Sequence, residues 1–196
     1  MGRIFCLMGK SASGKDAIYR RMISEGVGGL KGIVPYTTRP KRIKETDGKE
    51  YFFVSEEKMR EMEEAGRIIE RRAYNVVGGV WYYFTADDGQ IDLGEGSYLI
   101  IGTLEAYLKF RDYFGQDKVV PLYVEVEDGE RLSRALRREM KQQVPAYEEM
   151  CRRFLADSAD FSEEKLLAAG IVRRFSNTGT LEECYSGISS AVLSEL

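Results

Sequence analysis

The sequence predicts an α/β fold in which a parallel sheet is flanked by helices and a small α+β lobe is inserted. Two observations lead to this expectation. Short apolar runs alternate with segments of helical spacing along most of the 196 residues, which is typical of parallel strands joined by crossover helices. Between about residues 37 and 85 the pattern changes to a charged loop followed by strand-like runs, which indicates an inserted lobe.

Each element of this fold has its own local pattern. Apolar runs predict the strands of the parallel sheet at Ile4–Met8, Gly32–Pro35, Tyr98–Ile101, Val119–Val124 and Ile171–Arg174. Helical spacing predicts helices at Ala17–Ile23, Leu104–Tyr113, Glu130–Met140, Ala146–Ala156 and Leu181–Leu193. The lobe is expected to hold a strand at Tyr51–Val54, a helix from Ser55 to about Gly66, and strands Ile68–Tyr74 and Val80–Phe84 around the turn Asn75–Gly79.

A glycine-rich segment lies between the first predicted strand and the first predicted helix. Its residues are Gly9, Lys10, Ser11, Ala12, Ser13, Gly14, Lys15 and Asp16. This is the context of a phosphate-binding loop (P-loop), in which backbone N–H groups and a helix N-terminus hold a polyphosphate. We therefore expect the segment to bind a nucleotide, with the Lys15 charge at the outer phosphates. The alternative is a glycine-rich turn that binds nothing.

Composition excludes several classes of function. The formal charge of −3 gives no general attraction to nucleic acid or membranes, so neither is an expected partner. Because the chain has no histidine, it lacks Ser-His and Cys-His nucleophiles and histidine-bound metals. Three widely spaced cysteines, and no recognisable leader or membrane-spanning run, predict a cytoplasmic protein with reduced thiols.

A second motif opens the inserted lobe. The sequence T-T-R-P-K-R at residues 37–42 is followed by D-G-K-E-Y-F-F-V-S at residues 47–55. Arg39 and Arg42 are three residues apart and can direct two guanidinium groups at one phosphate, to which Tyr51 can add a hydroxyl donor. A solvated basic loop is the alternative interpretation.

With these two motifs the sequence resembles the guanylate kinase family over its first 85 residues. The resemblance implies a kinase that uses ATP to phosphorylate GMP to GDP. It implies that Arg39, Arg42 and Tyr51 bind the GMP phosphate. Tyr83 and Thr85 match further GMP-binding residues of the family, and Tyr82 is the alternative match for the tyrosine at Tyr83.

Glu70 matches the glutamate that reads guanine in this family. Guanine carries an N1–H and an amino group side by side, and one carboxylate can accept from both. Adenine has no such pair of donors, so a glutamate here favours guanine. The alternative is an exposed strand residue paired with Arg71 or Arg72.

Two basic clusters in the C-terminal half resemble the helical lid of nucleoside monophosphate kinases. Such lids close arginines over the transferring phosphoryl group, and Arg134, Arg138 and Arg153 are the candidates for this catalytic role beside Lys15. A charged solvent face is the ordinary alternative. The resemblance implies a single domain, 1–196, with a core (1–35, 86–130 and 157–196), a GMP-binding lobe (36–85) and a lid (about 131–156).

Mg²⁺ is the expected cofactor, with ATP as the phosphoryl donor. Asp16 is its candidate ligand, because it stands where a serine or threonine hydroxyl usually contacts this metal. The G-K-D ending of the loop also resembles the ribose 1,5-bisphosphate phosphokinases, which share the fold and use ATP. A guanylate-kinase-like binding module without catalysis is the third possibility, although such modules typically lose the loop that is intact here.

Overall fold

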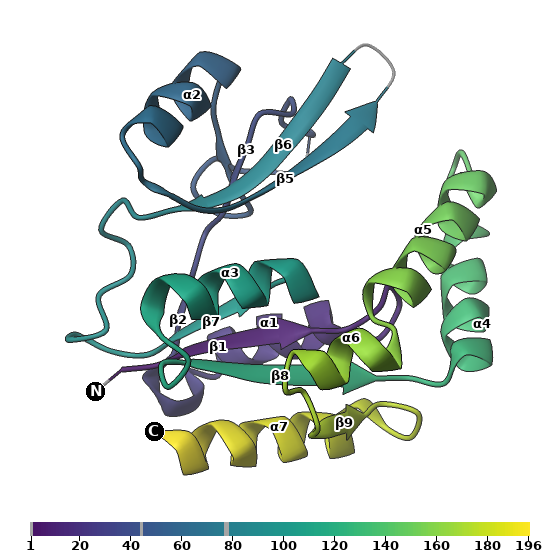
Figure 1. Cartoon of the computed structure of the whole chain (residues 1–196). Helices are drawn as coiled ribbons and strands as arrows, with labels where there is room; N and C mark the ends of the chain where they lie inside the picture. Colours follow the sequence, from purple (N-terminus) through teal and green to yellow (C-terminus); the bar gives the residue numbers. More distant parts are fainter. Residues whose placement is uncertain (1, 44, 77–78) are drawn as a thin grey trace.

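The computed structural model describes residues 2–43, 45–76 and 79–196. The chain forms a large parallel sheet covered by helices and a smaller sheet that stands to one side of it (Figure 1). Residues 77 and 78 of the predicted turn Asn75–Gly79 lie outside the described residues. In the part of the chain that the structure describes, no helix is both long and apolar enough to cross a membrane.

Five parallel strands form the large sheet in the order β2-β7-β1-β8-β9. Their bounds are β1 Ile4–Met8, β2 Lys31–Gly32, β7 Tyr98–Ile101, β8 Val119–Glu125 and β9 Arg174–Ser176. Central strand β1 is buried along its whole length. The loop that follows it therefore starts at the middle of the carboxyl edge, where open α/β sheets bind their ligands.

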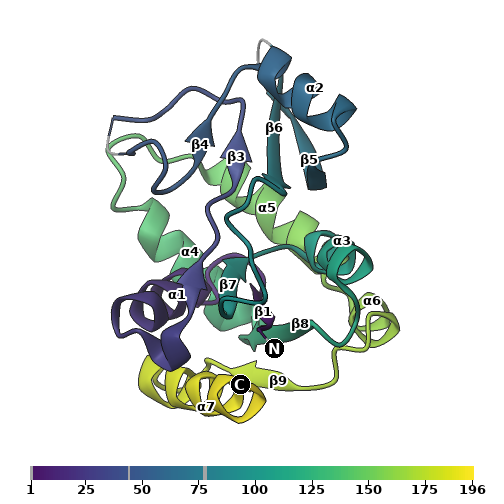
Figure 2. The same cartoon turned by 90° about the vertical axis from the view of Figure 1, so that its left-hand side faces the viewer.

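Helices cover both faces of this sheet (Figure 2). On one face α1 and α7 pack in a buried cluster with Phe5 and Leu7, and on the other α3 and α6 pack with Ile4 and Cys6. Successive residues of β1 thus serve opposite faces, as the alternation of a strand requires. This arrangement confirms the predicted α/β class. The helices are α1 Lys15–Ser24, α3 Leu104–Phe114, α6 Glu163–Ala168 and α7 Leu181–Glu195, with a short 3₁₀ helix at Val27–Gly29.

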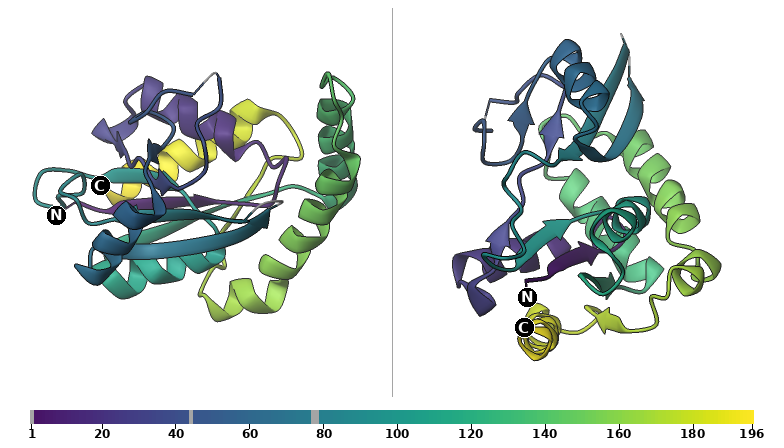
Figure 3. Two further views of the ribbon diagram at one scale, coloured as in Figure 1. Left: turned by 90° about the horizontal axis from the view of Figure 1, so that it is seen from above. Right: turned by 60° about the vertical axis from the view of Figure 1, so that its left-hand side comes forward.

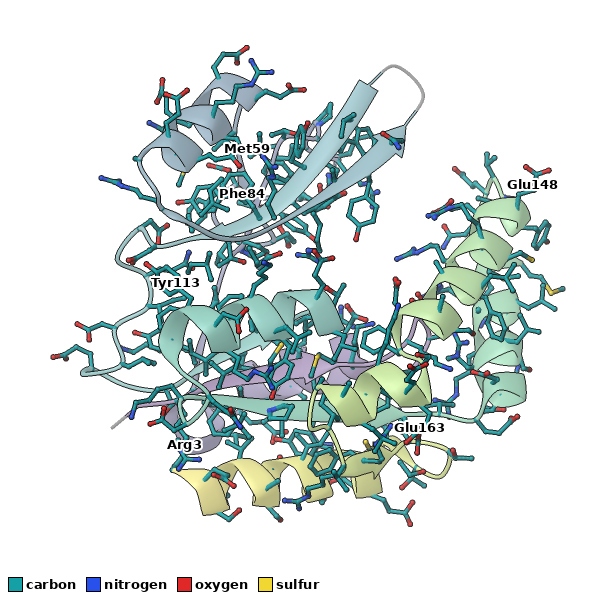
Figure 4. All side chains as sticks on the ribbon, in the orientation of Figure 1. Arg3, Met59, Phe84, Tyr113, Glu148 and Glu163 are labelled. Carbon is teal, nitrogen blue, oxygen red and sulfur yellow. The ribbon has the colours of Figure 1, made fainter. Side chains whose placement is uncertain are left out.

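The smaller sheet belongs to the inserted segment and has the strand order β4-β3-β6-β5. Met59 and Met62 of helix α2 pack on Phe84 and Ala86 of β6, which gives the segment a core of its own (Figure 4). Ile69 of β5 instead belongs to the buried cluster of the large sheet and α3. The next residue, Glu70, therefore lies where the two sheets meet. The elements are β3 Tyr36–Thr37, β4 Phe52–Phe53, α2 Glu56–Glu64, β5 Ile68–Val76 and β6 Gly79–Ala86.

Helices α4 (Asp128–Glu139) and α5 (Tyr147–Asp160) form an antiparallel pair beyond the end of β8 (Figures 1 and 3). In α4 only Arg131 and Ala135 are buried, and α5 has no fully buried residue. The pair therefore projects from the body of the molecule. Its attachment is the network around Arg131 described below.

Several elements differ from the sequence-based prediction, and the short strand β3 (Tyr36–Thr37) and the 3₁₀ helix at Val27–Gly29 were not predicted. The strand predicted at Ile171–Arg174 begins only at Arg174, because Ile171 fills the core just after α6, where its N–H donates to the Leu166 carbonyl. The strand predicted at Gly32–Pro35 ends at Gly32; the Ile33 N–H still donates to the Leu99 carbonyl, and beyond it both backbone groups of Val34 bond to the Gln90 side chain. Helix α6 was not predicted, because its six residues are too few for a clear helical period.

Candidate active site

The backbone of the P-loop requires small residues at several positions. Its residues Ala12 and Gly14 have φ angles of 63° and 88°, a region that L-residues rarely enter. A Cβ atom on Gly9 would lie 2.5 Å from the Val124 carbonyl oxygen. The glycine at position 9 therefore lets the loop pass close to β8, and Gly14 begins α1 as its N-cap residue. The loop ends at the N-terminus of a helix, as anion binding requires.

Asn177 fixes the loop from behind. Its buried side chain donates from Nδ2 to the Ser13 carbonyl at 2.7 Å, and its own N–H donates to the Glu125 carbonyl at 2.8 Å. A Cβ on Gly14 would lie 2.5 Å from this Nδ2, so glycine leaves the space that Asn177 needs. Arg134 donates from Nη2 to the Asn177 carbonyl at 2.8 Å.

Arg131 ties the loop to helices α4 and α5. Its side chain is 1% exposed and its guanidinium lies 3.9 Å from the centre of the Phe154 ring. It donates to Asp128 at 2.9 Å and to Asp157 at 3.3 Å. Asp157 in turn accepts the Ser11 N–H of the loop at 2.7 Å. A network of one buried arginine and two partly exposed aspartates therefore holds one of the loop N–H groups that the sequence assigns to a phosphate, and a phosphate that uses this N–H must displace Asp157.

Lys15 and Asp16 lie side by side at the start of α1. Their Nζ and Oδ2 atoms are 3.9 Å apart, and the Lys15 side chain is largely buried while the Asp16 side chain points to solvent. Burial lowers the pKa of Lys15, and the positive charges of Arg153 and Arg138 lower it further. The negative charges of Asp16 and Asp157 raise it but do not cancel the decrease. An anion bound in the loop would oppose this effect.

Among the described residues no group of three or more metal-ligating side chains converges on one point. The acidic donor at the start of α1 is the single carboxylate of Asp16. This donor set fits Mg²⁺, which commonly keeps several waters and is bound through one or two carboxylates and the phosphates of its substrate.

Arg138 of α4 and Arg153 of α5 line the same cavity between the two helices. Ser11 of the loop also lines this cavity, which has a volume of about 180 Å³. In the described part of the chain neither side chain makes a hydrogen bond or an ion pair, although both charges act on Lys15. Arg134 differs, because Glu130 at 2.9 Å and the Asn177 carbonyl already hold it. The structure thus brings two of the three candidate lid arginines to an open position beside the loop.

In the lobe, Arg39 is already engaged. Its guanidinium makes a two-pronged contact with Glu45 at 2.7 and 2.5 Å, and its Nε donates to the Tyr83 hydroxyl at 3.1 Å. The Arg39 hydrogen bonds lower the pKa of Glu45 to about 2. A phosphate that binds Arg39 must therefore compete with Glu45 or share its fork. Arg42 contributes only its backbone N–H to Glu45, and its side chain is exposed.

Aromatic rings surround the Arg39 guanidinium. The Tyr51 ring centre lies 5.2 Å from it and 5.5 Å from the Tyr83 ring centre. Tyr82, the alternative to Tyr83, lies on the other face of β6, where its ring packs against the lobe core and under Arg71. The strand register thus directs Tyr83 to the side of the lobe on which Arg39 lies.

Glu70 is buried, not exposed. Its Oε1 accepts from Thr85 Oγ1 at 2.9 Å and from Arg72 Nη2 at 3.3 Å, and its Oε2 accepts from Arg72 Nε at 3.0 Å. The alternative that pairs Glu70 with a neighbouring arginine is thus realised by Arg72, at a buried position. Burial alone would lower the pKa of Arg72, but the Glu70 charge and hydrogen bond outweigh it and the pKa is raised.

Several residues that contact the site were not among the predicted site residues. Arg131, Asp157, Asn177, Glu45 and Arg72 all contact a predicted site residue or the loop backbone. A weak signal existed for Arg72, which lies two residues from Glu70 on the same face of a predicted strand. Asp157 and Asn177 carry no such signal, because only the folded chain brings them to the loop.

Arg131→Ala should destabilise the protein by about 3 kcal/mol, because it leaves Asp157 and Asp128 without their buried cation. The measurement is the urea midpoint at constant m-value. Arg137→Ala on the same helix is the matched control and should change stability by less than about 0.5 kcal/mol, since its side chain is 67% exposed, bonds to Ser133 and makes only a 4.0 Å surface contact with Glu130. Equal midpoints for the two variants would contradict the structural role of Arg131.

Comparisons with known proteins agree with this geometry. The family model of guanylate kinase matches residues 1–84. Over 69 residues the chain is 42% identical to a guanylate kinase of Rhodopseudomonas palustris (strain HaA2) and 38% identical to one of Thermotoga maritima. Each match covers 35% of this chain and 31% or 33% of the relative. The matched segment thus spans about a third of these curated relatives.

The fold comparison extends further along the chain. A crystal structure of guanylate kinase from Anaplasma phagocytophilum superposes with a TM-score of 0.68 and 21% sequence identity. It covers 99% of this chain and 86% of that one. Residues 1–84 therefore match the guanylate kinase family model, and over nearly its whole length the chain shares the fold of that guanylate kinase structure.

Proposed function

We propose that this chain is a phosphotransferase that transfers the terminal phosphoryl group of ATP to GMP and so produces GDP. The observation that carries the proposal is the pairing of two sites in one chain. A P-loop with Lys15 lies at the carboxyl edge of the large sheet, and a lobe with Arg39 and the buried Glu70 lies beside it. The family match over residues 1–84 covers both the loop and Glu70.

The donor side of this proposal rests on residues 9–16. Loop N–H groups and the N-terminus of α1 would hold the ATP phosphates, and Lys15 would neutralise their charge. Arg138 and Arg153 are the best candidates for closing over the transferred group, because both lie beside the loop without another anionic partner among the described residues. Arg134 serves better as a positioning residue, since it holds the Asn177 carbonyl behind the loop.

The acceptor side rests on the lobe. Arg39, Arg42 and Tyr51 would bind the GMP phosphate and Glu70 would contact guanine. The fully buried Thr85 would serve the guanine site by holding Glu70, and Tyr83 would serve the phosphate site by orienting Arg39. A phosphate has two or more oxygens to offer, so it can replace the two oxygens of Glu45 at the Arg39 fork. Binding of the acceptor phosphate would therefore free Glu45 from Arg39 and change the contacts of the loop that carries it.

The chemistry needs no general base. The phosphate of a nucleoside monophosphate has a second pKa of about 6 and is largely ionised at neutral pH. The protein must therefore align two phosphates and reduce the charge repulsion between them. Lys15 and the arginines of the α4–α5 pair would supply fixed positive charge. Closure of this pair and of the lobe would exclude water and so suppress hydrolysis of ATP.

Mg²⁺ is the proposed cofactor, and Asp16 is its proposed ligand. When bound with ATP, the metal would neutralise phosphate charge as a Lewis acid. Asp16 would meet it with one carboxylate from the solvent side of the loop. The division into core, GMP-binding lobe (36–85) and lid (about 131–156), and a cytoplasmic location, remain predictions.

A coupled assay of ADP release with several acceptors tests the proposal. With ATP and Mg²⁺, GMP should exceed AMP by at least about tenfold in kcat/KM, because leaving buried polar groups unpaired costs on the order of 1–3 kcal/mol. UMP and ribose 1,5-bisphosphate complete the series. If ribose 1,5-bisphosphate is used faster than GMP, it is the acceptor in place of GMP. If none of the acceptors is used, the chain is a binding module.

Lys15→Ala should abolish phosphoryl transfer while the protein remains folded. The lysine neutralises charge that grows in the transition state, an effect worth several kcal/mol in a preorganised site. The comparison is kcat for the variant against wild type, with circular dichroism as the check on folding. Near-normal turnover by the folded variant is incompatible with this role.

Asp16→Asn should raise the Mg²⁺ concentration needed for half-maximal activity, because it keeps the shape but removes a ligand charge. Titration calorimetry of ATP with and without Mg²⁺ should show a smaller gain from the metal in the variant. GMP binding should change less. An unchanged metal dependence would assign Asp16 only to the helix dipole of α1.

A further inference from the structure

We propose that Arg72 is a second guanine-reading residue, which donates from its free edge to O6 and N7 of the base while it remains paired with Glu70. The inference rests on the proposed function and adds a specificity-determining residue to the acceptor site. Its basis is the side-on contact between the two side chains on β5.

The contact uses one edge of the guanidinium and leaves the other open. Arginine carries five N–H donors in a planar fork. Nε and Nη2 of Arg72 donate to the two oxygens of Glu70, and in the described part of the chain Nη1 has no hydrogen-bond partner. The remaining edge, formed by Nη1 and the second Nη2 hydrogen, is a two-pronged donor. The Arg72 side chain is 20% exposed, so this edge is accessible.

The same contact limits what Glu70 can do alone. A carboxylate offers about four acceptor positions. Thr85 and Arg72 occupy both positions on Oε1, and Arg72 occupies one on Oε2. One acceptor position therefore remains while the pair is intact. Glu70 can take a single guanine N–H, so recognition of the base needs a further group beside it.

Guanine supplies the complement to this pair. One edge of the base carries the N1–H and amino donors, and the neighbouring edge carries the acceptors O6 and N7. A guanidinium that donates to O6 and N7 is a strong and specific contact, because adenine presents an amino donor in place of O6. A glutamate and an arginine side by side on one strand face thus match two adjacent edges of guanine.

The surroundings place Arg72 on the acceptor side of the lobe. Burial raises the pKa of Tyr51, and the charges of Arg72 and Arg39 both act against that rise. Arg72 therefore lies near the tyrosine that is expected to contact the GMP phosphate. Its neighbour Arg71 points to the opposite face of β5, where it donates to Glu63 at 2.7 Å.

The test compares GMP with 7-deaza-GMP, in which a C–H group replaces N7. In the wild-type enzyme kcat/KM for 7-deaza-GMP should be lower by about fivefold or more, chiefly through KM, since one prong of the contact is lost. In Arg72→Lys, which keeps the charge beside Glu70 but has no fork, the two acceptors should differ by less than about twofold. Arg72→Ala should behave alike if it folds, and Arg71→Ala should retain the wild-type ratio.

Other outcomes overturn the inference. Equal use of GMP and 7-deaza-GMP by the wild-type enzyme rules out a contact to N7 without any variant. A wild-type ratio that persists in Arg72→Lys assigns the N7 contact to another group. A lower KM for GMP in Arg72→Ala would show that Arg72 competes with guanine for Glu70 and does not bind the base. In all three cases the wild-type enzyme still phosphorylates GMP, so the proposed function stands. A wild-type chain that does not use GMP refutes the proposed function and the inference with it.

Discussion

The geometry of the loop depends on the hydrogen bonds and ion pairs of the buried Arg131 guanidinium. It joins α4 through Asp128, α5 through Asp157, and the loop through the Ser11 N–H that Asp157 accepts. A phosphate-binding loop works only if its N–H groups are aligned before the phosphate arrives, because alignment on binding would consume affinity. With Asn177 on the other side, the loop is fixed from both flanks. The arginines of α4 and α5 are thereby held beside it.

A common principle connects the two acceptor-site carboxylates. Glu45 lies in the fork of Arg39, and Glu70 lies against Arg72. Each buried charge thus has an opposite charge at hydrogen-bond distance, which offsets the desolvation of both partners. Under the proposed function, a nucleotide that enters the lobe would have to replace or complete these contacts. A ligand with too few polar groups would leave both ion pairs intact, so the pairs would favour ligands that can bond to Arg39 and Glu70.

The fold was largely predictable from local patterns. Strands Ile4–Met8 and Tyr98–Ile101 were predicted with their observed bounds, because each is a continuous apolar run that begins after a polar residue and ends before a glycine. The strand near Ile171 was misplaced, since burial of an apolar residue does not require a strand. The P-loop and Arg39 were proposed from motif spacing, and Glu70 and Tyr83 from the resemblance to guanylate kinases; their roles in binding stay predictions.

What could not be predicted is the set of partners that these residues have in the folded chain. Asp157 lies 146 residues from Ser11, and Asn177 lies 164 residues from Ser13. No local pattern reports such pairs, because they depend on how α5 and β9 return to the loop. The pairing of Glu70 with Arg72 is local, yet the sequence alone left open whether it is a surface ion pair or a buried one. The exposed fraction of Glu70 distinguishes the two cases, and it is known only from the tertiary structure.

The central claim is that the loop and the lobe hold two nucleotides at once for direct transfer between them. Its most direct test is calorimetric binding of a compound that joins adenosine and guanosine through their 5′ ends by a polyphosphate. Because one molecule would occupy both sites, it should bind at least about a hundredfold more tightly than ATP or GMP alone. The matching compound with two adenosines should bind more weakly. An affinity for the adenosine–guanosine compound no higher than that for ATP would show that the two sites are not joined, and would contradict the account.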